Sequence, residues 1–546
     1  MSWPSIRRDV IAGIVVGVIA LPLSMALAVA VGAPPIAGLY TAAFAGATAS
    51  IFGGSRFNIT GPTAALVPLL SHVVLQHGFD ALPMVGVMAG VLLLVMYYFK
   101  VGRLIRFMPG TVIVGFTAGI AISIAFGQLN NILGLTGTDP KLEHFHEKLI
   151  DTIGQIGTLD ATTLAVGLIA LFTLFAWVRT PFARILPGPL LVVVALTAIT
   201  WGLDIETTTL GSRYGDLPTD IPTPSLSFFD AGLIVDLLPS AFAIAVLSSV
   251  ESLLSAVVAD GMARTTQKHD PDREILGQGL ANLVSPIMGG IPATAAIART
   301  AAGVRSGGNS RLVGVVHSIT VLSATLLLGS LAGNVPISVL AAILIFTAWN
   351  IADVPELKAL ITKAPRMDVV VLLMTVVITV VLDLTYAIGF GIIASAFLLI
   401  HQLMKLPAAK ELVADENGRV TEVSAELSAL MQARPDISFF TAQGMLSFHS
   451  VATFEYELNV DLSKPLILRM KDVHHIDTSG LMTLKGVIEH RQRHGSRIML
   501  SAIQPELLPV LERFGIIELI GRENVFPESR LAIASVEAPR EELVAT

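Results

Sequence analysis

The chain has 546 residues, of which 53% are hydrophobic and only 14% are charged. Soluble globular domains carry about 25% charged residues, so this composition indicates an integral membrane protein. It contains no cysteine, which excludes disulfides, thiol catalysis and cysteine metal sites, and its net charge of −7 gives no indication of a nucleic-acid partner.

Apolar windows predict about fourteen membrane spans or half-spans after a short polar start at residues 1–9. They lie near residues 10–31, 36–52, 62–76, 83–99, 111–133, 163–178, 188–203, 232–259, 275–288, 293–304, 312–331, 336–351, 368–382 and 386–403. The polar loop 204–231 separates a first repeat, residues 10–203, from a second repeat, residues 232–403. Each repeat has an odd number of spans, so the second must insert upside down relative to the first.

The loop charges indicate the orientation. Most Lys and Arg residues in the predicted loops fall on one side, and only Lys141, Lys148 and Arg213 fall on the other. The side rich in Lys and Arg faces the cytoplasm in most membrane proteins. We therefore expect a multi-pass protein of a bacterial inner (plasma) membrane with both termini in the cytoplasm.

The composition changes after residue 403. Residues 404–435 read as a polar linker, and residues 436–536 as a soluble α/β domain followed by a loose tail at 537–546. Within that domain the pattern predicts strands at 465–470 and 497–502 and helices at 478–490 and 506–514. This alternation favours a small open sheet with helices packed on it.

The segment from Gly289 to Thr300 is the most informative about function. Two glycines and a proline interrupt an apolar region, and small residues then predict a short helix that starts at Pro292. About a dozen residues separate Pro292 from the next polar loop, whereas a span needs roughly 20. A helix that starts inside the membrane leaves partly positive N–H groups unpaired, and Arg299 adds a full positive charge. The simplest partner for both is an anion.

Residues 52–65 look like the counterpart of this segment in the first half, with a glycine break and then Gly-Pro before a short helix. Two interrupted segments in corresponding positions are typical of transporters built from inverted repeats. We expect the helix starts to meet head to head at mid-bilayer and to hold an anion between them. The expected binding residues are Pro62, Thr63, Ala64, Ala298, Arg299 and Thr300. The alternative is a pair of structural kinks whose N–H groups bond to neighbouring protein or water.

Glu251 lies near the middle of the predicted span 232–259, where a carboxylate is costly and usually functional. Burial favours its protonated form, so Glu251 could carry a proton with the anion, or pair with Arg299 in the empty state. The alternative is a structural carboxylate bonded to serine or backbone. Ser255, one turn later, and Pro22, which could open backbone groups in the first span, are secondary candidates.

Four motifs in order make the chain similar to the SulP family of anion transporters, which includes the animal sulfate, chloride and bicarbonate exchangers. The motifs are residues 20–26 with 32–40, 53–56 with 60–65, 297–300 with 306–308, and 476–480 in a module that resembles a STAS domain. The resemblance covers nearly the whole chain. It implies an all-α membrane part of seven plus seven inverted spans, as in the uracil permeases, divided into core and gate domains. It also implies a homodimer and an anion site between the third and tenth helices.

The resemblance also bears on coupling and regulation. Sodium-coupled bicarbonate members are expected to have Asp and Thr where this chain has Glu251 and Ser255, which favours a proton over sodium. Ser479 corresponds to the serine that kinases phosphorylate in related anti-sigma-factor antagonists, so a cytoplasmic regulator could act there. The alternative is that Ser479 caps the helix that begins at that point.

Together these observations predict a secondary active transporter that couples protons to uptake of sulfate or a C4-dicarboxylate such as fumarate, by elevator-like alternating access. Bicarbonate transport or anion exchange is the next alternative, ahead of chloride. A passive anion channel and a membrane-anchored STAS sensor are alternatives of other classes. No enzyme is expected, because no cluster of nucleophile, base and orienting group is evident, and we expect neither a cofactor nor a metal.

Overall fold

The computed structural model divides the chain into two compact units, residues 1–395 and 396–546. It describes residues 3–103, 110–139, 145–184, 186–215, 220–382, 409–411, 425–446 and 461–536, with single residues or short pieces between them. The first unit is helical and the second contains a sheet of five strands.

The first unit consists of apolar helices joined by short connections. In the first half these are α1 (Trp3–Val31), α2 (Pro35–Tyr40), the π-helix η1 (Thr41–Ala45), α3 (Gly46–Phe52), α4 (Val67–His77), α5 (Ala81–Tyr98), α6 (Gly110–Gly127), α7 (Leu129–Leu133), α8 (Phe145–Gly154), α9 (Ala161–Trp177) and α10 (Gly188–Gly202). In the second half they are α11 (Leu210–Tyr214), α12 (Ile234–Met262), α13 (Pro271–Ile287), α14 (Ile297–Arg305), α15 (Leu312–Ala332), α16 (Ile337–Ile351), α17 (Val354–Lys363) and α18 (Arg366–Val381).

Among the described residues, 7 helical stretches are long and apolar enough to cross a membrane, and shorter apolar helices accompany them. Every span predicted before residue 383 coincides with one or more of these helices. Of the last predicted span, 386–403, the structure describes half of the residues, all of them helical, and the rest lie outside the described residues. The short helices α8, α11 and α17 lie in segments that we expected to be loops.

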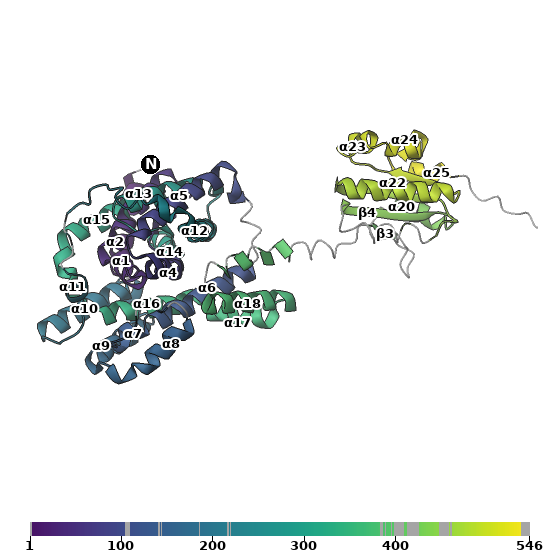
Figure 1. The fold of residues 1–546 in the computed structure, drawn as a ribbon. Coiled ribbons are helices and arrows are strands. Elements are labelled where there is room, and N and C mark those ends of the chain that lie inside the picture. Colours follow the sequence, from purple (N-terminus) through teal and green to yellow (C-terminus); the bar gives the residue numbers. More distant parts are fainter. Residues whose placement is uncertain are drawn as a thin grey trace, which may run out of the picture. The chain divides into compact units, whose positions relative to one another are not determined.

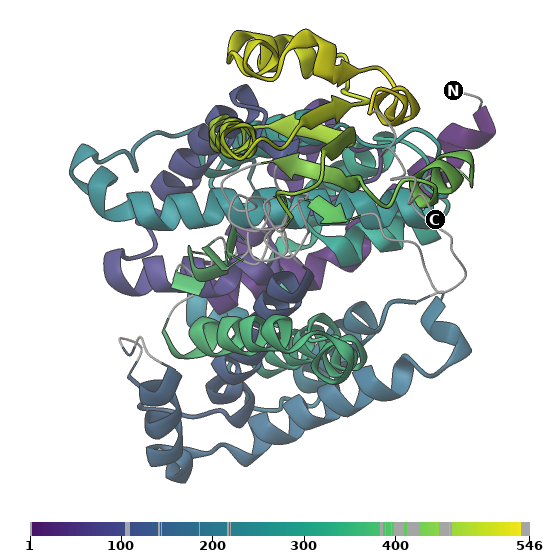
Figure 2. The same cartoon turned by 90° about the vertical axis from the view of Figure 1, so that its right-hand side faces the viewer.

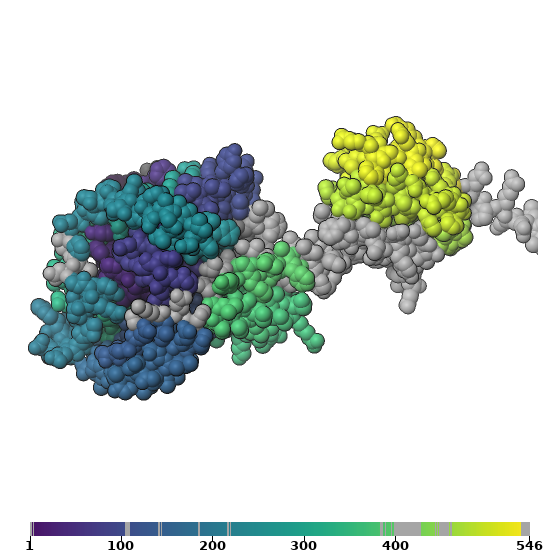
Figure 3. Space-filling model, in the orientation of Figure 1, coloured from purple at the N-terminus to yellow at the C-terminus, as the bar shows by residue number. Residues whose placement is uncertain are grey.

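The helices form two groups, and each group mixes both halves of the chain. Helices α1 to α5 and α12 to α15 form one group, and helices α6 to α10 with α16 to α18 form the other (Figures 1 and 2). In the first group α1 packs along α15, where a Cβ on Gly13 or Gly17 would come within 2.6 or 2.7 Å of side chains on α15. Segments from the two halves also alternate over the surface (Figure 3). This arrangement confirms the predicted division into core and gate.

The two interrupted segments meet inside the first group. Strand β1 (Thr60–Gly61) pairs antiparallel with β2 (Thr294–Ala295), so that Thr60 lies opposite Ala295. The 3₁₀ turn η2 (Ala64–Leu66) and α4 follow β1, and α14 follows β2. We call this two-stranded ladder, with the extended residues that flank it, the crossing. Because its strands are antiparallel, the two helices leave the crossing in opposite directions, and their starts lie close together.

The predicted helix start at Pro292 is wrong. Helix α14 begins at Ile297, and its N-cap residue Ala296 has extended backbone angles (φ −98°, ψ 118°). The reason is the strand pairing, since the N–H of Ala296 also donates to the carbonyl of Ile59 at 3.0 Å. The backbone between Pro292 and Ala296 therefore belongs to the crossing.

The second unit is a sheet with helices on both faces. Its strands are β3 (Ala409–Glu411), β4 (Ser438–Leu446), β5 (Leu466–Ile476), β6 (Ile498–Ser501) and β7 (Val525–Phe526), in that order, and all pairs except β3 with β4 are parallel. Its helices are α20 (Ala425–Gln432), α22 (Thr478–Arg493), α23 (Leu508–Arg513), α24 (Ile516–Ile520) and α25 (Ser529–Ala534). Two apolar cores form, one beneath α22 and α24 and one beneath α20 and α25. The predicted sheet with packed helices is confirmed, and β3 and α20 extend the unit into the segment 404–435.

A salt bridge next to β4 makes the stability of the second unit depend on pH. Arg434 donates from Nε and Nη2 to both carboxylate oxygens of Asp436, at 2.9 and 2.8 Å. This bond holds the pKa of Asp436 below its ordinary value. Because the folded-state pKa is lowered, the stabilisation exists at neutral pH and is lost as the pH falls through that lowered pKa.

We therefore expect Arg434→Ala to destabilise the second unit by about 1 kcal/mol more at neutral pH than at a pH below the pKa of Asp436, since its bond to the Val536 carbonyl is lost at both. Hydrogen exchange in β4 and α25 of the full-length protein, compared with wild type at each pH, measures this. Arg493→Ala is the control, because Arg493 is largely exposed and its pair with Glu489 is 3.6 Å long. Equal effects of both changes would contradict the prediction.

Candidate anion-binding site

Both helix starts at the crossing have unpaired amides. In the described part of the chain, the N–H groups of Ala64, Ala65, Ile297, Ala298 and Arg299 find no acceptor. Neither η2 nor α14 has a side-chain cap. Unpaired amides at a helix start carry partial positive charge. Since Ile297 and Ala298 are exposed, a ligand can reach the start of α14.

Arg299 is buried against β1, with 2% of its surface exposed. Its Nη2 donates to the carbonyl of Pro62, while Nε and Nη1 have no partner among the described residues. The described residues also show no ion pair between Arg299 and Glu251, the pairing considered above. The guanidinium is therefore held next to β1, with two of its three nitrogen atoms unpaired among the described residues.

Glu251 reaches the start of the first half-helix. It lies in α12, and the hydroxyl of Thr63 donates to its Oε2 at 3.1 Å. Among the described residues this is the one hydrogen bond to the Glu251 carboxyl group, and the residue as a whole is half-buried. The structure therefore brings together Thr63, Glu251 and the unpaired amide of Ala64.

The other predicted residues surround this centre. Thr300 is buried, and its hydroxyl accepts from the N–H of Ile59 and from the hydroxyl of Ser255, both at 3.0 Å. These two bonds join the residue before β1 and helix α12 to α14. Pro22 is buried in α1, which continues through it as one helix and packs against α4 and α14.

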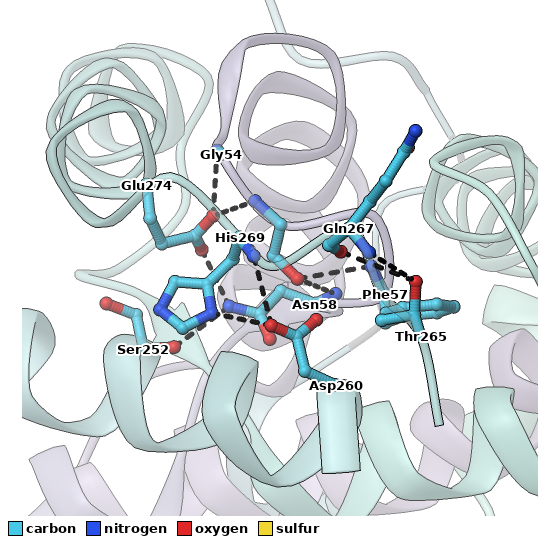
Figure 4. A network of polar contacts seen from close by, with 10 residues as sticks. Gly54, Phe57, Asn58, Ser252, Asp260, Thr265, Gln267, His269 and Glu274 are labelled. Atoms are coloured by element: carbon cyan, nitrogen blue, oxygen red, sulfur yellow. Dashed lines mark hydrogen bonds and ion pairs between the residues drawn. The ribbon is translucent and has the colours of Figure 1, made fainter. Parts of the chain in front are cut away.

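Sequence reasoning missed a carboxylate beside β1. Glu274 in α13 is 1% exposed and accepts from the N–H groups of Gly54 and Ser55 at 2.9 and 2.8 Å. Asn58 also donates to Glu274, at 2.7 Å, and to the carbonyl of Ser252 (Figure 4). The sequence did contain a signal for this carboxylate. Polar side chains recur every four residues at positions 274, 278 and 282, in and just before a predicted apolar span, which places them on one helix face.

Figure 4 also shows a second buried carboxylate at the end of α12. Asp260 is 3% exposed and accepts from the backbone N–H of His269 at 3.0 Å and lies 2.9 Å from its Nδ1. This contact ties the end of α12 to the loop before α13. Asp260 is therefore a structural partner of that loop.

A cavity of about 720 Å³ lies between the two helix groups, lined by the ends of α1 and α4 and by parts of α6, α7, α16 and α18. Its lining includes Val67 and Pro68 but not Thr63, Glu251 or Arg299. The first turn of α4 therefore separates this cavity from the crossing.

Ser479 does not cap its helix. Asp477 occupies the N-cap position of α22, and its carboxylate accepts from the N–H of Gly480 at 2.8 Å. Ser479 follows in the first turn and is half-buried. The capping role considered for Ser479 is therefore wrong, because the neighbouring aspartate fills it.

Any side chain larger than hydrogen at position 61 is expected to clash with Arg299. A Cβ at this position would lie 2.3 Å from Nη1 of Arg299 and 3.3 Å from Cα of Ala42. We expect Gly61→Ala to displace the guanidinium and to lower the rate of anion uptake at least about tenfold, since small misplacements in a site have effects of this size. Proteoliposome uptake measures the rate. Gly110→Ala is the control, because its added methyl meets nothing within 4 Å, and a similar loss there would refute the explanation.

The fold and the site define a multi-pass membrane transporter that carries a small α/β unit. The model of the sulfate permease family matches residues 6–375, and that of the STAS domain matches residues 428–532. The chain belongs to the sulfate permease family and is an anion transporter, not an enzyme.

Individual relatives agree over most of the chain. It is 36% identical over 525 residues to the Bacillus subtilis (strain 168) protein "Putative sulfate transporter YvdB", covering 95% of this chain and 96% of that protein. It is 27% identical over 500 residues to "Bicarbonate transporter BicA" of Picosynechococcus sp., covering 90% and 87%. Among solved structures, SLC26A9 has the same fold, with a TM-score of 0.82 and 19% identity over 97% of this chain and 90% of that one.

Proposed function

We propose that the protein is a proton-coupled symporter in which an anion binds between the starts of η2 and α14 and a proton binds Glu251. The observation that carries the proposal is the hydrogen bond from Thr63 to Glu251, which holds this carboxyl group, with its single hydrogen bond among the described residues, beside the amide donors. An anion at those donors repels an ionised carboxylate. Binding of the anion therefore favours protonation of Glu251, and the two are transported together.

The charges of the site support net selectivity for anions. Two helix starts contribute partial positive charges, and Arg299 contributes a full charge that forms no ion pair with a carboxylate among the described residues. Neutral Glu251 leaves this potential intact, whereas ionised Glu251 cancels part of it. The loaded state is therefore close to electrically balanced for a divalent anion.

We propose sulfate or a C4-dicarboxylate such as fumarate as the substrate. Both are divalent, which suits two helix starts and a guanidinium, and the relative at 36% identity is named for sulfate. Bicarbonate is the second candidate, because another relative is named for it. The proposed coupling to protons rests on Glu251 and applies to either substrate.

The two helix groups support alternating access by an elevator-like movement. The crossing lies wholly within the group of α1 to α5 and α12 to α15, so this group can carry the site past the other one. The cavity of about 720 Å³ lies along the boundary where such a movement would occur. We further propose an inner-membrane homodimer with both termini in the cytoplasm, and regulation through Ser479.

The test is uptake by purified protein in proteoliposomes. Sulfate, fumarate, bicarbonate and chloride are each supplied with and without an inward proton gradient. We expect uphill accumulation of one divalent anion when the gradient is present. Downhill current alone would indicate a channel, and accumulation that depends on sodium would contradict the proposed coupling.

A further inference from the structure

Helix α13 presents a column of buried polar side chains to the strand crossing. Glu274, Gln278 and Asn282 are 1%, 0% and 0% exposed. Their four-residue spacing places them on one face of the helix, one above the next. Polar groups at such depth destabilise a fold unless each one is hydrogen-bonded. The partners of this column therefore show what it holds in place.

Glu274, at the N-terminal end of the column, holds the loop 54–58 that leads into β1. One oxygen of Glu274 accepts from the N–H groups of Gly54 and Ser55, and the other accepts from the side chains of Asn58 and Gln278 at 2.7 and 3.0 Å. All four partners are N–H donors, which suits an ionised carboxylate. Glu274 therefore differs from Glu251, which has one hydroxyl donor and is partly exposed. Glu274 therefore serves as the acceptor that holds this loop.

The middle of the column holds both strands. Nε2 of Gln278 donates to the hydroxyl of Thr60 in β1 at 2.9 Å. Asn282 bonds to the backbone of Ala293, the residue before β2, by donating to its carbonyl at 2.8 Å and accepting from its N–H at 2.9 Å. One helix thus bonds to β1 and to the start of β2, on the two sides of a ladder of only two residue pairs.

The same support continues beyond the column. The hydroxyl of Ser285 donates to the carbonyl of Ile291 at 2.8 Å, and the N–H of Ile291 donates to the hydroxyl of Thr41 at 2.7 Å. Thr41 opens the π-helix η1. The extended segment that precedes α14 is therefore bonded to α13 or η1 at Ile291 and Ala293, which limits its freedom to shift.

We propose that Glu274, Gln278 and Asn282 are positioning residues for anion binding. They fix the register of β1 against β2, and this register sets how far the amides of Ala64 and Ala298 lie from each other. None of the three touches the anion. The expected effect on the KM for the anion rests on the proposed function. The expected effect on hydrogen exchange at the crossing does not depend on the proposed function.

Glu274→Gln tests the proposal, because it removes the charge and replaces one of the two acceptor oxygens, each of which holds two donors, by an NH2 group. We expect the KM for the anion to rise about tenfold or more while kcat changes less than about twofold, since preorganisation of the binding groups is lost rather than the transport step. We also expect faster hydrogen exchange at residues 53–63. Gln278→Met, which has a similar shape, should give a smaller change in the same direction.

The double variant Glu274→Gln with Gln278→Glu restores the net charge but not the contacts to the loop. We expect it to remain defective, and full recovery would overturn the proposal. Thr375→Val is the control for loss of a buried hydrogen bond, because its hydroxyl donates within α18 in the other helix group. It should change neither KM nor the exchange of residues 53–63.

The two readouts separate the two proposals. Unchanged exchange at residues 53–63 in Glu274→Gln would overturn the positioning role, whatever happens to transport. Faster exchange with an unchanged KM would overturn its link to anion binding. If wild-type protein transported none of the four anions, the proposed function would fail, and hydrogen exchange would still decide whether the column holds the crossing.

Discussion

Glu251→Gln is expected to abolish accumulation of the anion against its gradient while leaving downhill exchange intact. Glutamine keeps the shape of the side chain and an oxygen that can accept from the Thr63 hydroxyl. It cannot bind or release a proton in the relevant range, so the proton gradient no longer drives uptake. Anion binding should persist, because the amide is neutral as the protonated acid is.

The measurement is uptake into proteoliposomes with and without a pH gradient, together with exchange of labelled against unlabelled anion at equal pH. Glu356→Gln is the matched control, since Glu356 is an exposed carboxylate on α17. We expect it to behave as wild type. If Glu251→Gln accumulated the anion to the wild-type level under a pH gradient, proton coupling through this residue would be wrong.

Arg299→Gln should weaken anion binding, and the lost binding free energy should be proportional to the charge of the anion. For charges roughly 8 Å apart at an effective dielectric constant of about 20, Coulomb's law gives about 2 kcal/mol for each unit of anion charge. Losing the guanidinium charge should therefore raise Kd about 30-fold for a monovalent anion and about 1000-fold for a divalent one. Arg299→Lys keeps the charge and should have a much smaller effect.

Ligand-dependent shifts of the thermal unfolding temperature, measured with sulfate and with chloride in detergent, give the two affinities. The unfolding temperature without anion shows whether the variant is folded, since Arg299 also donates to the Pro62 carbonyl. An equal loss for both anions would show that Arg299 acts through a local contact. An unchanged Kd for both would remove it from the site.

The sequence was sufficient to predict where the membrane helices are interrupted. Gly289 and Gly290 before Pro292, and Gly61 before Pro62, cannot continue a regular helix in lipid, so the breaks follow from local chemistry. The position of Glu251 also followed, because a carboxylate in an apolar span stands out. These features are local and need no knowledge of the partners.

What the sequence could not predict depends on contacts between distant segments. Strands β1 and β2 have two residues each, too short for any periodic pattern, and they exist only because they pair with each other. The side on which Arg299 lies is likewise decided by Gly61, which leaves room for the guanidinium. For α22, Asp477, Thr478 and Ser479 could all cap a helix, and only the backbone geometry selects Asp477.

The pairing of β1 with β2 has a consequence for biogenesis. A nascent chain that has released its first repeat into the bilayer holds Asn58 and Thr60 without the partners that the second repeat later supplies. Polar backbone exposed to lipid is costly, so the third span should stay near the translocon, or in water, until α13 and β2 emerge from the ribosome. Maturation of this protein is then a late, concerted event rather than a helix-by-helix insertion.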